Sequence, residues 1–164
     1  MRAILIALLL ASSPALALYN IGDSIPNLCW TDVRNWQICL GHHMERVRVL
    51  IYSTGWCTYC KEEYRELVPL LDEFKNEPVS FISLSASGWN SVASPDQGFL
   101  QEWRDTFDIP FPVAASPRDA GLKFFDSPGV PNVAIIDKEG KLAYKKVGAG
   151  VPAILSKVRE LMRK

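Results

Sequence analysis

Two cysteines separated by two residues, Cys57 and Cys60, are the groups in this sequence best suited to chemistry. They stand where a strand-like run at residues 47–52 gives way to apolar residues at helical spacing. A cysteine in the first turn of a helix has its thiolate stabilised by free backbone N–H groups, which lowers its pKa below the usual value of about 8.5. The second cysteine can close a disulfide with the first, so the pair predicts a two-electron switch that exchanges with other dithiols.

The same spacing also occurs in half of a zinc site. The sequence holds no second C-x-x-C pair, and its four cysteines are separated by nine, 17 and two residues, unlike paired zinc knuckles. Trp56, the strand before the pair and the helix after it favour redox chemistry. We therefore expect no metal and no cofactor at this site.

Cys29 and Cys39 fall on the two arms of an expected N-terminal β-hairpin. In an exported protein such a pair suggests a cross-strand structural disulfide. A second redox pair that relays electrons to Cys57 and Cys60 is the alternative.

The elements that position these cysteines follow from the hydrophobic pattern. Strands are expected at residues 28–31, 36–40, 47–53, 79–85, 133–137 and 142–147. Helices are expected at residues 59–76, 95–107, 117–125 and 152–163. Pro69 should kink the first helix, and Ser94 and Ser116, each followed by proline, should cap the second and third. This order predicts an α/β protein, a sheet with helices packed on its faces.

The first 17 residues have the features of a secretory signal peptide: one positive charge, an apolar stretch and a small-x-small site ending at Ala17. An uncleaved anchor is the alternative, but a spanning helix needs about 20 apolar residues, and Ser12, Ser13 and Pro14 interrupt the run. We expect one domain at residues 18–164, exported to the periplasm and without a membrane span after cleavage. Eighteen basic and 18 acidic side chains balance, which argues against nucleic acid as a partner. We expect a monomer.

Three segments together resemble a known family. They are the W-C-T-Y-C run at residues 56–60, Gly129-Val130-Pro131 before the strand at 133–137, and the turn at 137–140. Over nearly the whole mature chain the sequence resembles the thioredoxin-like fold and, within it, the exported TlpA/ResA-like thiol-disulfide oxidoreductases. The resemblance implies a central mixed sheet flanked by helices, with an N-terminal β-hairpin and an inserted strand-helix unit at residues 79–107.

The resemblance also implies roles for single residues. Cys57, nearer the helix start and more exposed, would be the attacking thiolate, and Cys60 the buried resolving thiol. Pro131 would be cis, and Val130 would present its backbone to the substrate. Trp56 would shield the site, although it can equally be a packing aromatic.

Thioredoxin carries an acid on the strand before the motif, where this chain has Ile51. ResA-like proteins carry a Glu three residues after the second cysteine, and Glu63 occupies that position. The resemblance therefore implies that Glu63 handles the proton of the buried thiol, with Glu62 as the natural control. A solvated helix carboxylate is the alternative.

Two departures from the family pattern affect the prediction. The family's helix has a proline where this chain has Arg65, and the residues between the cysteines are Thr58 and Tyr59. Because no histidine stands between the cysteines to stabilise the thiolate further, we expect a reductant. Its partners would be protein dithiols or disulfides and a membrane or exported electron donor.

Two other functions stay open. Thr54 lies three residues before Cys57, as in peroxiredoxins, but Leu50 stands where their pattern has proline. A thiol peroxidase using Cys57 is therefore one alternative. The other is a metal-binding chaperone that uses the cysteines and His42 or His43 to carry copper.

Overall fold

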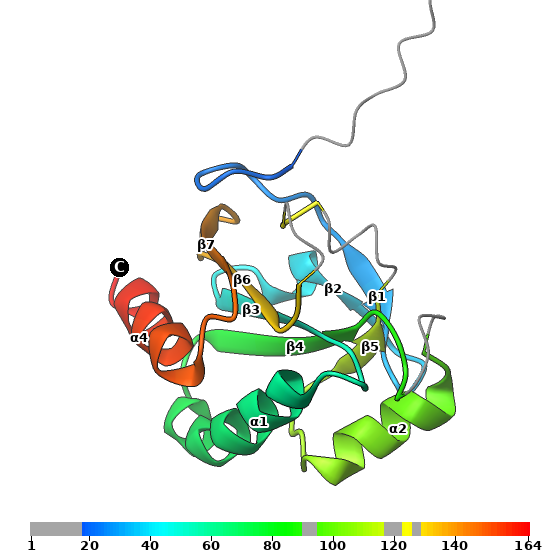
Figure 1. Cartoon of the computed structure of the whole chain (residues 1–164). Coiled ribbons are helices and arrows are strands. Elements are labelled where there is room, and N and C mark those ends of the chain that lie inside the picture. Colours follow the sequence, from blue (N-terminus) through cyan, green and yellow to red (C-terminus); the bar gives the residue numbers. More distant parts are fainter. Residues whose placement is uncertain (1–17, 90–94, 117–122, 126–128) are drawn as a thin grey trace, which may run out of the picture.

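The computed structural model describes residues 18–89, 95–116, 123–125 and 129–164. Its centre is a five-stranded sheet with the strand order β5-β4-β3-β6-β7 (Figure 1). The strands are β3 (Val47–Ser53), β4 (Val79–Ser85), β5 (Val113–Ala115), β6 (Asn132–Ile136) and β7 (Leu142–Val147). β3, β4 and β5 run parallel, whereas β6 and β7 add antiparallel neighbours. The expected mixed sheet is confirmed.

Four of the described helical segments pack against one face of this sheet (Figure 1). They are α1 (Thr58–Leu67), the 3₁₀ helix η2 (Val68–Phe74), α2 (Gln97–Thr106) and α4 (Val151–Met162). β3 is buried along its whole length, because it lies at the centre of a sheet that is covered on both faces. Val49 and Ile51 face the helices, and Leu50 and Tyr52 face the opposite core.

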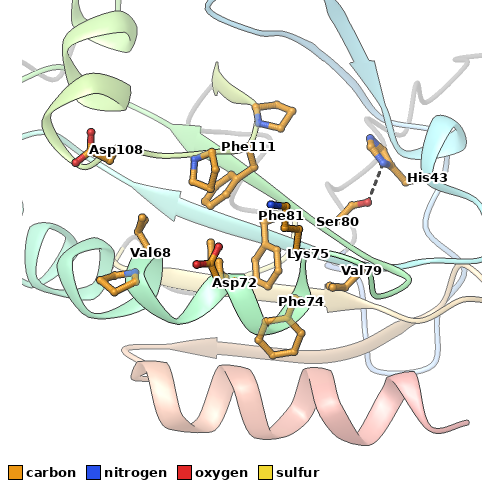
Figure 2. Close-up of a pocket in the computed structure, with 14 residues that line it drawn as sticks. His43, Val68, Asp72, Phe74, Lys75, Val79, Ser80, Phe81, Asp108 and Phe111 are labelled. Carbon is orange, nitrogen blue, oxygen red and sulfur yellow. Dashed lines mark hydrogen bonds between the residues drawn. The ribbon is translucent and has the colours of Figure 1, made fainter.

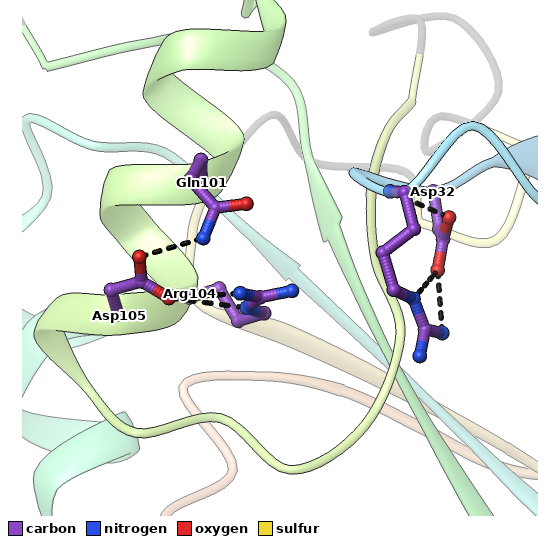
Figure 3. A network of polar contacts seen from close by, with 5 residues as sticks. Asp32, Gln101, Arg104 and Asp105 are labelled. Carbon is purple, nitrogen blue, oxygen red and sulfur yellow. Dashed lines mark hydrogen bonds and ion pairs between the residues drawn. The ribbon is translucent and has the colours of Figure 1, made fainter.

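The opposite face is covered by the N-terminal segment and by Phe124 and Phe125. A two-stranded sheet, β1 (Cys29–Thr31) and β2 (Gln37–Cys39), forms the expected hairpin and is followed by the 3₁₀ helix η1 (Leu40–His43). The buried carboxylate of Asp32 accepts hydrogen bonds from the backbone N–H groups of Arg34 and Trp36. It also pairs with the Arg34 guanidinium (Figure 3). These contacts fix the turn of the hairpin. Val33 N–H donates a hydrogen bond to the Val113 carbonyl, which attaches the hairpin to β5.

Two local expectations were wrong, and one strand was missed. The α-helix ends at Leu67 and continues as the 3₁₀ helix η2 around Pro69, because proline has no N–H for an α-helical bond. The second helix begins at Gln97, and its cap is Asp96, whose Oδ1 accepts a 2.8 Å hydrogen bond from Phe99 N. β5, with three residues, was not predicted at all.

Two of the expected segments lie outside the described residues, wholly or in large part. The signal peptide at residues 1–17 lies outside the described residues, as does most of the short helix expected at 117–125. Within the ranges that are described, none of the helices has the length and apolar character needed to cross a bilayer.

Candidate active site

Cys57 caps the N-terminus of α1, where the chain turns from β3 into the helix. Its Sγ accepts a hydrogen bond from the backbone N–H of Cys60 at 3.1 Å. This contact uses one of the N–H groups that a helix leaves unpaired at its first turn, and the same groups favour a negative charge on sulfur. The second contact of Sγ is the carbonyl oxygen of Val130, at 3.6 Å.

The two thiols differ in burial. Cys57 is 5% exposed and Cys60 is fully buried, and neither is in a disulfide. Cys57 is the more exposed of the pair, as expected, and its sulfur lies against the Val130 carbonyl. Burial, followed by the hydrogen bond with Cys57, raises the pKa of the Cys60 thiol well above its usual range.

Glu63 is the carboxyl group that α1 buries beside this pair. Its side chain is 6% exposed, and its Oε1 has no hydrogen-bond partner among the residues that the structure describes. Burial raises the pKa of Glu63 to about 7, and the nearby charge of Glu66 acts in the same direction. Glu62, its neighbour in the sequence, is exposed. The helix thus turns Glu63 toward the protein interior and Glu62 toward solvent.

Val130 and Pro131 form the other wall of the site. The peptide bond between them is cis, and the Pro131 carbonyl accepts a 2.8 Å hydrogen bond from Gly148 N. A pocket of about 290 Å³ lies between this loop and α1. Its lining includes Tyr59, Glu62, Glu63, Glu66, Val130 and Pro131.

Ile51 lies beneath the helix, fully buried and paired in register with Ser83 of β4. No acid therefore stands at this point of the strand. Instead, the buried hydroxyl of Tyr64 contacts Ser83 Oγ at 2.6 Å.

Trp56 lies at the surface next to Cys57, with 53% of its area exposed. Its indole N–H donates a 3.0 Å hydrogen bond to Ser87 Oγ. Ser87 was missed by sequence reasoning, since a serine in the loop after a strand carries no distinguishing pattern.

The other candidate residues lie apart from the thiol pair. Cys29 and Cys39 are joined in a disulfide across the β1–β2 hairpin. His43 lies within 3.0 Å of Ser80 Oγ, at the end of β4 opposite the thiols, on a pocket of about 670 Å³ (Figure 2). His42 is exposed. Over the described ranges, no group of three or more His, Cys, Asp or Glu side chains is arranged to hold a metal ion.

Comparison with known proteins identifies relatives of this chain. The sequence model of the AhpC/TSA family matches residues 21–145. A thiol-disulfide oxidoreductase ResA of Bacillus cereus is 28% identical over 132 residues, which cover 79% of this chain and 70% of ResA.

Solved structures share the fold. A thiol:disulfide interchange protein of the thioredoxin family from Chlorobium tepidum TLS superposes with a TM-score of 0.72 at 14% identity, over 86% of this chain and 97% of that one. A peroxiredoxin-like protein from Aquifex aeolicus gives a TM-score of 0.65 at 21% identity, over 88% of each chain. These likenesses show a thioredoxin-like fold.

Proposed function

The chain belongs to the AhpC/TSA family, and we propose that it is a thiol-disulfide oxidoreductase of the thioredoxin-like type. One observation carries the proposal. The sulfur of Cys57 caps a helix N-terminus, faces the Val130 carbonyl beside Pro131, and has the buried thiol of Cys60 one helical turn away. The ResA relative bears the name of a thiol-disulfide oxidoreductase.

In the first step the Cys57 thiolate attacks one sulfur of a substrate disulfide. A bond forms between Cys57 Sγ and that sulfur, and the other substrate sulfur leaves as a thiolate that takes up a proton. Val130 offers its backbone to the substrate segment next to the reacting sulfur, and Trp56 forms the surface on the other side.

In the second step Cys60 resolves the mixed disulfide. Its thiol gives its proton to the Glu63 carboxylate, and the resulting thiolate attacks Cys57 Sγ. The Cys57–Cys60 disulfide forms, and the second substrate thiolate leaves. The substrate gains two electrons and the protein loses two.

The chemistry of the mixed disulfide helps this proton transfer. Besides burial and the charge of Glu63, two contributions from Cys57, its hydrogen bond and its charge, raise the pKa of Cys60. Both contributions weaken when Cys57 is bonded to the substrate, so Cys60 ionises more readily at the stage where it must attack.

We further propose that the protein works as an exported reductant of protein disulfides, most simply as a periplasmic monomer comprising residues 18–164. The features of residues 1–17 support export. The dipeptide Thr58-Tyr59 supports the reducing direction, because it offers no imidazole to stabilise the thiolate. A membrane or exported dithiol protein would return the protein to its reduced form.

Reduction of insulin disulfides tests the proposal. Wild-type protein should reduce insulin, Cys57→Ser should be inactive, and Cys60→Ala should accumulate a mixed disulfide that dithiothreitol releases. Cys57→Ser protein that reduces insulin at the wild-type rate would overturn the assignment. Identification of what Cys60→Ala traps in its own cell would name the substrate.

Thiol peroxidase is the second candidate, and Thr54 is the observation in its favour. Thr54 stands three residues before Cys57, and within the described part of the chain its buried Oγ1 has no hydrogen-bond partner. In that reaction Cys57 thiolate would take an oxygen atom from a peroxide to give a sulfenic acid and an alcohol, and Cys60 would then close the disulfide with loss of water. Cys57-dependent peroxide consumption faster than insulin reduction would favour this candidate.

A further inference from the structure

The loop after β4 is bound to the loop that carries Cys57. Ser87 accepts two hydrogen bonds from that loop: its Oγ from Trp56 Nε1 at 3.0 Å, and its carbonyl from Gly55 N at 3.2 Å. An indole N–H can only donate, so the Ser87 hydroxyl oxygen is the acceptor for Trp56. Ser87 itself is 4% exposed, which keeps water from replacing it.

The two loops also touch along their backbones. A Cβ on Gly55 would lie 2.7 Å from the carbonyl carbon and oxygen of Gly88, and 2.6 Å from Cε2 of Phe99. Ala86 N donates a 3.0 Å hydrogen bond to the Ser53 carbonyl at the end of β3. The loop at residues 86–88 therefore fixes the segment that leads from β3 to Cys57.

The next residue of the same loop contacts the other side of the cysteine pair. The ammonium group of Lys61, which follows Cys60, lies 5.2 Å from the centre of the Trp89 ring. Trp89 in turn packs edge-on against Phe99, with ring centres 5.2 Å apart. One short loop thus contacts the residue before Cys57 and the residue after Cys60.

Trp56 needs such an anchor because half of its ring faces solvent. Tyr59 is also exposed, so the surface next to Cys57 in the chain carries two aromatic side chains. An exposed ring without a hydrogen bond samples several rotamers, and substrate binding then carries the entropic cost of fixing it. With the indole held by Ser87, the flat apolar face is fixed before the substrate arrives.

We propose that Ser87 is a positioning residue that determines specificity, through Trp56, for protein substrates with an apolar residue beside the reacting cysteine. The inference rests on the proposed function, since it assumes that Cys57 exchanges with protein disulfides. Glutathione disulfide has no apolar side chain to place on the ring, because its cysteine is flanked only by γ-glutamate and glycine, so Ser87 should matter little for it.

The test compares insulin with glutathione disulfide as oxidants of the reduced protein. Ser87→Ala should lower kcat/KM for insulin about 3- to 10-fold, mainly through KM, which is the range expected for one hydrogen bond. Its rate with glutathione disulfide should stay within about twofold of wild type on the same reasoning. Ser87→Thr, which keeps the hydroxyl, should restore the insulin rate.

Two further variants make the result decisive. Ser80→Ala removes a serine hydroxyl that is hydrogen-bonded to His43 and Arg46 at the far end of β4, and it should leave both rates unchanged. In a Trp56→Phe background, Ser87→Ala should have no additional effect, because the donor to Ser87 is already gone.

Each outcome has one meaning. Equal slowing of both probes by Ser87→Ala, or an undiminished effect in the Trp56→Phe background, would overturn the role of Ser87 alone. If Ser87→Ala fails to fold, Trp56→Phe decides, because it removes the donor and leaves Ser87 in place: a loss of about 3- to 10-fold with insulin alone supports the role, and equal slowing of both probes contradicts it. Wild-type protein that exchanges with neither probe would overturn the proposed function itself.

Discussion

The carboxylate of Glu63 and the thiol of Cys60 are buried one helical turn apart on α1. Burial raises the pKa of both groups, and the charge of Glu63 raises the pKa of Cys60 further. Each group therefore favours its neutral form when the other is charged. A carboxylate with a pKa of about 7 changes its protonation state near neutral pH, where a general base is most effective.

The pH profile of exchange should reveal Glu63. Below its pKa of about 7 the carboxyl group is protonated and cannot accept the Cys60 proton. Insulin reduction should therefore rise through pH 7 and level off above it. In Glu63→Gln this inflection should disappear, and the rate at pH 8 should fall about 100-fold. Glu62→Gln, on the exposed side of the helix, should keep the wild-type profile. An unchanged inflection in Glu63→Gln would assign it to another group.

The stability of Glu63→Gln should depend on pH in a defined direction. The carboxyl pKa is higher in the folded protein, about 7, than its ordinary value of 4.5. The folded state thus binds more protons between these values, and stability from this group falls as pH rises from about 4.5 to 7. At pH 8 Glu63→Gln should be more stable than wild type by on the order of 1–3 kcal/mol, and at pH 4 the gain should vanish. Urea unfolding of both proteins at the two pH values measures this difference in the free energy of unfolding. A loss of stability at pH 8 would contradict the prediction.

Removal of the Cys29–Cys39 disulfide should affect stability without stopping exchange. The bond closes a short loop, with a sequence separation of 10, for which loop entropy predicts a loss of about 2–3 kcal/mol. The double variant Cys29→Ser/Cys39→Ser should show that loss in urea without reductant, and should reduce insulin at the wild-type rate. A stable but inactive double variant would instead support an electron relay through this pair.

Gly55→Ala should disturb the contact between the loop that carries Cys57 and the loop at residues 86–88. The new methyl group would overlap the Gly88 backbone and the Phe99 ring. We therefore expect the free energy of unfolding to fall by about 2–4 kcal/mol, as at other overpacked sites, and disulfide exchange to be slower. Gly98→Ala on α2 is the control, because its nearest neighbour is an Asp96 oxygen at 3.4 Å; its stability should change by less than about 1 kcal/mol. Equal melting temperatures for the two variants would exclude the predicted clash.

Much of the fold followed from local patterns. The bounds of β3 and β4 agree with the expected strands at 47–53 and 79–85, because long apolar runs flanked by turn residues identify buried strands. β5 escaped prediction, because three residues carry no periodicity and the strand exists only through its pairing with β4. The cap of α2 is Asp96 and not the expected Ser94. Both residue types can cap a helix, so the choice between them depends on where the helix begins.

The sequence by itself determined the redox pair, the element order around it and the position of Glu63 on the helix, since each depends on spacing along one strand or helix. Only the tertiary structure decided that Glu63 is buried beside Cys60, that the Val130 carbonyl lies against Cys57 Sγ, and that Ser87 holds Trp56. These contacts join segments far apart in the chain or depend on what covers a helix face. Desolvation and hydrogen bonding of this kind arise from packing, which no local pattern encodes.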